Sequence, residues 1–283
     1  MRFSVYQDSQ AGGRPDNQDR MGYCFTREAL LLVLADGMGG HAHGEIAAAL
    51  ALQTIGDCFQ TAALPMVSDV CSFLDESLYA AHLALHRYRA NYRLPDTPRT
   101  TIVACVVQQG QAVWAHCGDS RLYWLRGGRI LARTTDHSHV ERLVALGRLK
   151  PYERATHPDR NKLYNCLGAP TLPSIDKSVP VTLKEGDQLL LCSDGLWGSV
   201  SEHELAYRLS ASSLERAIPE VVDRAVRAGG KNSDNVTALA LTWLVDVASD
   251  AEPSTLLTDG MPPDRVITNL QCSLPTQAGS QKS

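Results

Sequence analysis

The chain has 283 residues, of which 44% are hydrophobic and 20% are charged, as is typical of a soluble globular protein with one large or two small domains. Its formal net charge of −4 argues against a general nucleic-acid binder, which would carry a basic surface. The N-terminus has no apolar segment resembling a signal peptide, and the strongest apolar run, residues 29–35, is too short to cross a membrane. The eight cysteines contain no C-x-x-C pair, which favours free thiols in a reducing cytoplasm.

The first third of the chain predicts strands followed by two helices. An alanine- and leucine-rich segment beginning near residue 44 is expected to be the first helix. The second helix is expected over Met66–Tyr92, because apolar residues recur there at three- and four-residue steps between Pro65 and Pro95. Strands are expected before these helices over residues 2–9, 21–26 and 30–35.

The middle of the chain returns to strands. Short turns separate four apolar runs between residues 100 and 133, which predicts antiparallel hairpins. A short helix is expected over 138–146, and the polar segment 147–170 is expected to be irregular. Strands are then predicted over residues 179–183, 188–192 and 236–244, with helices over 202–209 and 214–228.

This order of elements predicts the fold class. Helices grouped between antiparallel strands favour an α+β layered sandwich over a wound βαβ sheet. After residue 245 the composition shifts to Ser, Thr, Pro, Asp and Gly without periodicity. We therefore expect one folded domain over residues 1–245 and a mostly disordered tail over residues 246–283.

Aspartates stand at the edges of several predicted strands. Asp36 and Asp194 each end an apolar run and are each followed by glycine, and Asp119 lies in a hairpin turn. A single such aspartate is most simply a turn residue. Several carboxylates at one sheet edge would repel one another unless a cation lay between them, and Mg²⁺ or Mn²⁺ prefers oxygen ligands.

The stretches that carry these acids resemble the motifs of the metal-dependent protein phosphatases, the protein phosphatase 2C-like (PPM) family, in its stand-alone bacterial form. They are RPDNQD, LADGMGG, HCGDSR, LLLCSDGLWG and KNSDNVTAL, and the resemblance runs from about residue 3 to residue 244. It implies a four-layer αββα sandwich of two antiparallel β-sheets flanked by helix pairs. It also implies that residues 1–245 form the catalytic domain, with a flap over the cleft at about residues 137–168.

The resemblance assigns metal ligands by position. Asp36 corresponds to an aspartate that bridges two Mn²⁺ or Mg²⁺ ions, and the carbonyl of Gly37 to a ligand of the second ion. Asp194 and Asp234 correspond to the other ligands of the first ion. Asp119, with Asp194, corresponds to the ligands of a third, weaker ion.

The same resemblance implies the reaction, hydrolysis of phosphoserine or phosphothreonine in proteins. A water bridging the two ions loses a proton and attacks phosphorus, while Arg14 grips the substrate phosphate through its planar guanidinium. The catalytic residues are thus expected to be Arg14, Asp36 and Asp194. Around them, Gln18 and Asp19 correspond to a pair that contacts metal-bound water, and Asn235 to a neighbour of the site.

Three positions depart from the family pattern. Met38 stands where many eukaryotic members have a histidine that acts as a general acid, and Arg99 stands where a glycine is usual. Within the flap, Tyr164 and Asn165 replace a common Thr-Arg pair. The proton donor to the leaving oxygen therefore stays open, with a metal-bound water and three histidines as candidates: His41, His43 and His157.

Rival functions leave different traces in a sequence. A zinc site at His41 and His43 lacks supporting ligands, and no P-loop, cysteine-phosphatase signature or G-x-S-x-G motif occurs. A non-catalytic phosphoprotein-sensing module of the same fold should have lost metal acids, which are all present. A phosphatase of small phosphate esters stays open. We expect a monomeric cytoplasmic enzyme that acts on phosphorylated proteins and opposes a Ser/Thr kinase, without nucleic-acid partners.

Overall fold

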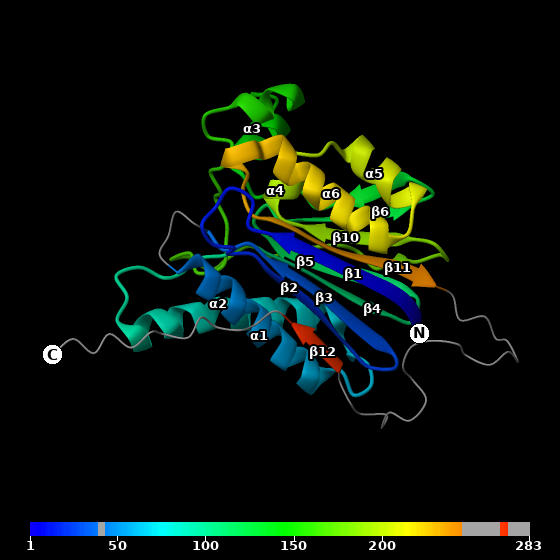
Figure 1. Ribbon diagram of the computed structural model, residues 1–283. Coiled ribbons are helices and arrows are strands. Elements are labelled where there is room, and N and C mark those ends of the chain that lie inside the picture. The colour runs from blue at the N-terminus through cyan, green and yellow to red at the C-terminus, as the bar shows by residue number, and fades with distance from the viewer. Residues whose placement is uncertain (39–42, 245–266, 271–283) are drawn as a thin grey trace, which may run out of the picture.

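A computed structural model describes residues 1–38, 43–244 and 267–270. Two antiparallel β-sheets pack face to face, and helices cover both outer faces (Figure 1). This arrangement confirms the four-layer αββα sandwich expected from the sequence.

One sheet has five strands and is covered by the C-terminal helices. Buried side chains of these helices pack against one face of the sheet around Leu190, Cys192 and Ala238. The helices are α4 (Asp194–Trp197), α5 (Glu202–Ala211) and α6 (Leu214–Gly229), and a 3₁₀ turn η2 (Gly230–Asn232) follows. In spatial order the strands are β1 (Arg2–Gln10), β11 (Val236–Leu244), β10 (Gln188–Cys192), β6 (Arg121–Arg126) and β7 (Arg129–Arg133).

The other sheet has seven strands and is covered by α1 (Gly44–Ala62) and α2 (Val70–Tyr92). Its main path is β12 (Ile267–Leu270), β2 (Arg20–Phe25), β3 (Ala29–Ala35), β4 (Ile102–Gln108), β5 (Gln111–Cys117) and β8 (Asp176–Lys177), and β9 (Val181–Thr182) also pairs with β5. The expected strand at 179–183 is therefore shorter, and β8 was not anticipated.

Strand β3 explains why its sequence is apolar at every position. Leu31 and Val33 pack with the core under α1 and α2, whereas Leu32 and Leu34 pack into the core between the two sheets. Successive side chains of a strand point to opposite faces, so a strand buried on both faces loses the usual alternation. The strand ends where Asp36 begins the site described below.

Two helical predictions need correction. Helix α2 begins at Val70 rather than at Met66, because the Asp69 side chain caps it by accepting the backbone N–H of Ser72 at 3.1 Å. The segment 147–170 is not irregular throughout, since it contains the 3₁₀ helix η1 (Pro151–Thr156). The short helix α3 (His139–Ala145) before it agrees with the expectation to within one residue, and Ser138 caps it.

Within the segment expected to be a mostly disordered tail, the structure describes four residues. Residues 267–270 form β12, which pairs antiparallel with β2, with Asn269 opposite Tyr23. The four residues of β12 pair on one side only, with β2, and so short a segment carries too little sequence periodicity to be recognised as a strand. The rest of the tail lies outside the described residues. No helix in the described part of the chain has the length and apolar character needed to cross a membrane.

Candidate active site

Loops at the ends of strands from both sheets bring five aspartates together. Asp36 follows β3, Asp194 begins α4 directly after β10, and Asp119 lies in the turn between β5 and β6. The Asp36 carboxylate is in electrostatic contact with each of the other four. We call this set the acid cluster: Asp19, Asp36, Asp119, Asp194 and Asp234.

The acid cluster carries more negative charge than its surroundings neutralise. Burial, together with neighbouring carboxylates, raises the pKa of Asp19 to about 6 and that of Asp194 to about 7. The same two causes raise the pKa values of Asp36 and Asp119 well above the usual value for aspartate. Carboxylates that resist ionisation in this way are characteristic of sites where a cation completes the charge balance.

The surroundings of Asp19 fit a bound cation. Ser193 Oγ donates a hydrogen bond to Asp19 Oδ2 at 2.7 Å, whereas Asp19 Oδ1 is buried without a hydrogen-bond partner. A buried carboxylate oxygen without a partner is costly, and an ion or an ion-bound water would satisfy it. The donors are all oxygen atoms, which suits Mn²⁺ or Mg²⁺.

The glycine after each strand-terminal aspartate is required by close packing. A Cβ atom on Gly37 would lie 2.3 Å from the carbonyl oxygen of Gly44, and one on Gly195 would lie 2.1 Å from that of Asn235. In both Asp-Gly pairs, the missing side chain therefore lets a second loop approach the acid. The Gly37 carbonyl remains a predicted ligand.

The segment before β4 fixes the backbone of Asp36. The Asp36 carbonyl accepts the N–H of Thr101 at 2.9 Å and the hydroxyl of Thr100 at 2.8 Å. Its neighbour Met38 donates its backbone N–H to the carbonyl of Arg99 at 3.0 Å, and the Arg99 guanidinium pairs with Asp96 at 3.2 Å. Arg99, which stands where the family usually has glycine, therefore binds the backbone of Met38 through its carbonyl, while its guanidinium forms an ion pair with Asp96.

Arg14 reaches the acid cluster in an arrangement that the sequence did not predict. Its Nε and Nη2 atoms donate to the two carboxylate oxygens of Asp234, at 3.0 and 2.8 Å. The hydrogen bond and the charge of Asp234 raise the pKa of Arg14. The side chain of Arg14 is 55% exposed, so its fork is accessible to an incoming anion.

The side chain of Asn235 bonds to backbone groups of the neighbouring loop, which is a structural role. Its side-chain amide donates to the carbonyls of Ala11 and Asp16, both at 2.9 Å, and its Oδ1 accepts the N–H of Gln18 at 2.9 Å. Asn235 therefore holds the loop that carries Arg14 against the start of β11. The predicted water contact of Gln18 stays a prediction.

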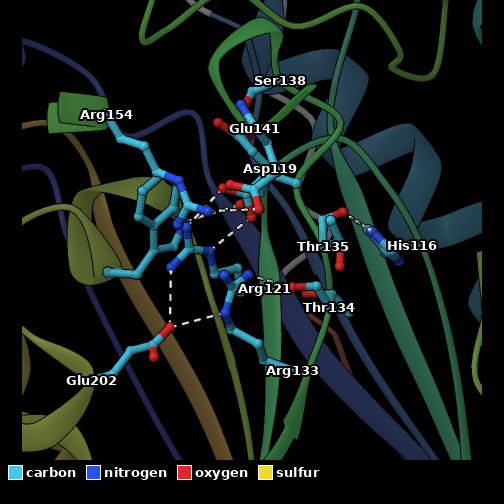
Figure 2. Close-up of polar contacts among 12 residues, drawn as sticks. His116, Asp119, Arg121, Arg133, Thr134, Thr135, Ser138, Glu141, Arg154 and Glu202 are labelled. Atoms are coloured by element: carbon cyan, nitrogen blue, oxygen red, sulfur yellow. Dashed lines mark hydrogen bonds and ion pairs between the residues drawn. The ribbon is translucent and has the colours of Figure 1, made fainter. Parts of the chain in front are cut away.

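Trp197 lies beside the acid cluster and was not singled out from the sequence. Its indole N–H donates to the carbonyl of Asp119 at 2.9 Å, and Arg121 stacks 3.6 Å above its ring. Arg121 is fixed in turn by a buried fork to Asp136, at 2.8 and 2.7 Å. Figure 2 shows Arg121 and Arg133 both directed toward Glu202. Trp197 lies one helical turn after Asp194, but nothing in the local sequence indicates its contact with Asp119, which is 78 positions away.

A group of two histidines and an aspartate beside the acid cluster has the spacing of a metal site. The ligand atoms of His116, His137 and Asp176 all lie within 4.8 Å of one another. However, His137 Nδ1 accepts the backbone N–H of Gly118 at 3.2 Å, so Nε2 carries the proton and faces Asp176 at 3.3 Å. This hydrogen-bond pattern favours a structural role for His137 over metal binding.

His116 completes this structural group. It is buried, and its Nε2 bonds to the carbonyl of Thr135 at 2.8 Å (Figure 2), as expected for a core histidine with a satisfied ring. Burial lowers the pKa of His116.

The three candidate proton donors lie in different places. His41 lies outside the described residues, and His43 precedes α1. His157 accepts the backbone N–H of Asp159 at 3.0 Å.

Comparison with known proteins identifies the family. The family described as Protein phosphatase 2C matches residues 9–229, a range that contains four members of the acid cluster. The chain belongs to the protein phosphatase 2C family. Asp234 lies five residues beyond the matched range, and its fork with Arg14 joins it to the same site.

Individual members of the protein phosphatase 2C family resemble the chain over most of its length. The serine/threonine phosphatase stp of Listeria innocua is 31% identical over 229 residues, covering 80% of this chain and 90% of that protein. The crystal structure of the serine/threonine phosphatase Stp1 from Staphylococcus aureus has a TM-score of 0.79 and 29% identity, covering 86% of this chain and 96% of that one.

A solved structure also bears on the ions of the protein phosphatase 2C family. The catalytic domain of the serine/threonine protein phosphatase PstP was crystallised in complex with two manganese ions. It has a TM-score of 0.72 and 28% identity, covering 86% of this chain and 99% of that one. A homologue with this fold has therefore been crystallised with two manganese ions.

Proposed function

We propose that the chain is a Mn²⁺- or Mg²⁺-dependent phosphatase that removes phosphate from phosphoserine and phosphothreonine residues of proteins. The observation that carries this proposal is the acid cluster, whose carboxylates repel one another and leave a buried oxygen of Asp19 unsatisfied. Membership of the protein phosphatase 2C family and the phosphatase names of its relatives support the reaction.

The chain's own residues divide the work of holding the ions. Asp36 and the Gly37 carbonyl would hold the second ion, with Asp36 shared by both. Asp194 and Asp234 would be the other ligands of the first ion. Asp119, together with Asp194, would hold a third ion. When bound, the ions supply Lewis-acid chemistry that activates a water molecule and offsets charge on the phosphate oxygens.

Arg14 is proposed to bind the substrate phosphate. Its guanidinium already forms a bidentate fork on the Asp234 carboxylate, and the same fork matches two oxygens of a phosphate. When substrate binds, its phosphate would therefore replace the Asp234 carboxylate as the partner of the exposed Arg14 side chain. Asn235 orients the Arg14 loop through the carbonyls of Ala11 and Asp16, while Asp19 and Gln18 would orient water beside the ions.

The cellular setting is also a proposal. Removal of phosphate from proteins implies phosphoprotein substrates and an opposing Ser/Thr kinase, and we expect the enzyme to act as a monomer. Seven cysteines in the described part of the chain are free thiols, which supports a reducing cytoplasm as its location.

The test compares substrates with and without divalent ions. We expect purified protein to hydrolyse a phosphothreonine peptide with added Mn²⁺, and to lose this activity in excess chelator. A protein that binds the peptide without turnover would instead be a sensing module. Much faster turnover of a small phosphate ester than of any phosphopeptide would favour the small-ester alternative.

A further inference from the structure

The flap, residues 137–168, is basic although the chain as a whole is acidic. It contains six Lys or Arg residues and three Asp or Glu residues, a formal net charge of +3, whereas the complete chain has a net charge of −4. The six basic residues are Arg142, Arg148, Lys150, Arg154, Arg160 and Lys162.

The acids of the flap neutralise only some of this positive charge. Arg154 pairs with Glu141 at 2.9 Å, and Lys162 pairs with Asp159 at 2.7 Å. The third acid, Glu153, accepts the backbone N–H of Lys150 at 2.7 Å. Four basic side chains remain exposed and have no ion-pair partner within residues 1–38, 43–244 and 267–270: Arg142, Arg148, Lys150 and Arg160.

Both ends of the flap are anchored beside the acid cluster. His137 donates its backbone N–H to the carbonyl of Gly118 at 2.9 Å, directly next to Asp119. At the other end, the N–H of Leu167 donates to the carbonyl of Thr100 at 2.9 Å, and the Thr100 hydroxyl donates to the Asp36 carbonyl. In Figure 1 the flap, with α3, forms the top of the view, on the same side as α4.

Exposed aromatic side chains lie among the unpaired charges. Tyr152 is 73% exposed, with the ammonium of Lys150 placed 5.7 Å from its ring centre, and Tyr164 is 56% exposed. Arginine and tyrosine are enriched where proteins bind other polypeptides, because they combine contact area with hydrogen bonding. The flap thus presents both a positive field and surfaces that can contact a peptide.

We propose that this basic flap surface binds acidic residues that flank the phosphorylated residue of the substrate, so that the preferred substrates are phosphoproteins with acidic phosphosites. This inference rests on the proposed phosphatase activity. Exposed ion pairs are individually weak, so two or three of them together give a preference on the order of tenfold in kcat/KM. Opposite charge also accelerates encounter, and salt weakens both effects.

The first experiment uses three phosphothreonine peptides of equal length with acidic, neutral or basic flanking residues. We expect kcat/KM with Mn²⁺ to be about tenfold higher for the acidic peptide than for the neutral one, and lowest for the basic one. The preference should shrink as NaCl rises from 50 to 500 mM. Equal values for all three peptides would overturn the flap inference and leave the proposed function intact, whereas hydrolysis of none would overturn both.

The second experiment reverses charge on the flap. The double variant Arg148→Glu, Lys150→Glu should lower the ratio of acidic-peptide to basic-peptide kcat/KM to about one or less. Arg129→Glu is the control for a charge reversal outside the flap, because Arg129 is exposed on β7 at the far edge of the five-stranded sheet, and its ratio should stay at the native value. Thermal unfolding of each variant checks that the fold is retained.

A competition measurement separates peptides from other polyanions. An unphosphorylated acidic peptide should inhibit the native enzyme and inhibit the double variant less. If a DNA duplex inhibits in a flap-dependent manner while the acidic peptide does not, the surface binds nucleic acid and the inference is wrong. An unchanged peptide ratio in a folded double variant would also contradict it.

Discussion

Two parts of the molecule bury carboxylates, and they surround them in opposite ways. Asp187, which precedes β10, is fully buried and receives both Nε and Nη2 of Arg126 at 2.6 Å, with the Trp124 indole N–H at 3.0 Å. Burial alone would raise the pKa of Asp187, but these donors lower it below its usual value. In the acid cluster, Asp36 faces other carboxylates, and its pKa is raised.

The difference separates acids that stabilise the fold from acids kept for function. A buried charge with fitted partners contributes a satisfied network, whereas buried like charges destabilise the protein until something binds between them. Proteins retain such unfavourable groups at functional sites. The comparison can therefore be tested by removing one charge from each region.

The largest expected effect is the loss of turnover on removing a charge from the acid cluster. We expect Asp36→Asn and Asp194→Asn each to lower kcat/KM by about 1000-fold, because an ion contributes several kcal/mol of transition-state stabilisation. In chelator these variants should unfold at the same or a higher temperature than the native chain, since they relieve repulsion. Steady-state kinetics and calorimetry test both statements, and near-native turnover in either variant would contradict the metal assignment.

Asp187→Asn should have the opposite pattern. Replacing the Asp187 carboxylate weakens the hydrogen bonds that it accepts from Arg126, Trp124 and Lys184, which should destabilise the fold. Urea unfolding measures this loss, while kcat/KM at temperatures below unfolding should stay near the native value. If Asp187→Asn abolished turnover without lowering stability, the distinction between the two regions would fail.

The raised pKa values also predict how stability depends on pH. In the unfolded chain an aspartate titrates near pH ~3.9, whereas in the folded chain the pKa of Asp19 is about 6 and that of Asp194 about 7. The folded state therefore binds more protons between these values, so in chelator the stability from these groups should fall as pH rises from about 4 to 7.

Added Mn²⁺ should restore stability most strongly near neutral pH, because ionised carboxylates bind the ion. Unfolding temperatures measured from pH 5 to 7.5, with chelator and with Mn²⁺, give the two curves. The chelator curve of Asp194→Asn should be shallower than that of the native chain. A native curve that rises with pH in chelator would show that the cluster does not dominate this range.

Prediction from the sequence was most reliable for features that a single strand and its burial determine. The apolar runs of β3 and β10, and the aspartates that end them, were recognisable because burial on two faces and a strand end leave strong local signals. The aspartates' convergence depended on the family resemblance, since nothing local states that Asp36 and Asp194 meet. The fork of Arg14 on Asp234 spans 220 positions and has no sequence signature.

The contacts of Trp197 were missed for a related reason. An apolar aromatic residue after a buried strand is usually part of the core, and only the fold brings the Asp119 carbonyl within reach of its N–H. Strand β12 was missed because four residues carry too little periodicity. Helix α2 begins at Val70 rather than at the predicted Met66, because the Asp69 side chain caps the helix there although the apolar spacing begins earlier.

The smallest predicted effect concerns the tryptophan that donates a hydrogen bond to an aspartate in each region. Trp197→Phe removes the N–H donated to the Asp119 carbonyl, and Trp124→Phe removes the N–H donated to Asp187. Each loss should destabilise the fold by about 1 kcal/mol. Only Trp197→Phe should also weaken the weakest Mn²⁺ site, by about fivefold for a comparable loss of positioning energy. Calorimetric Mn²⁺ titration separates the two variants, because equal Mn²⁺ binding by both would mean that the Trp197 bond stabilises the fold without positioning Asp119.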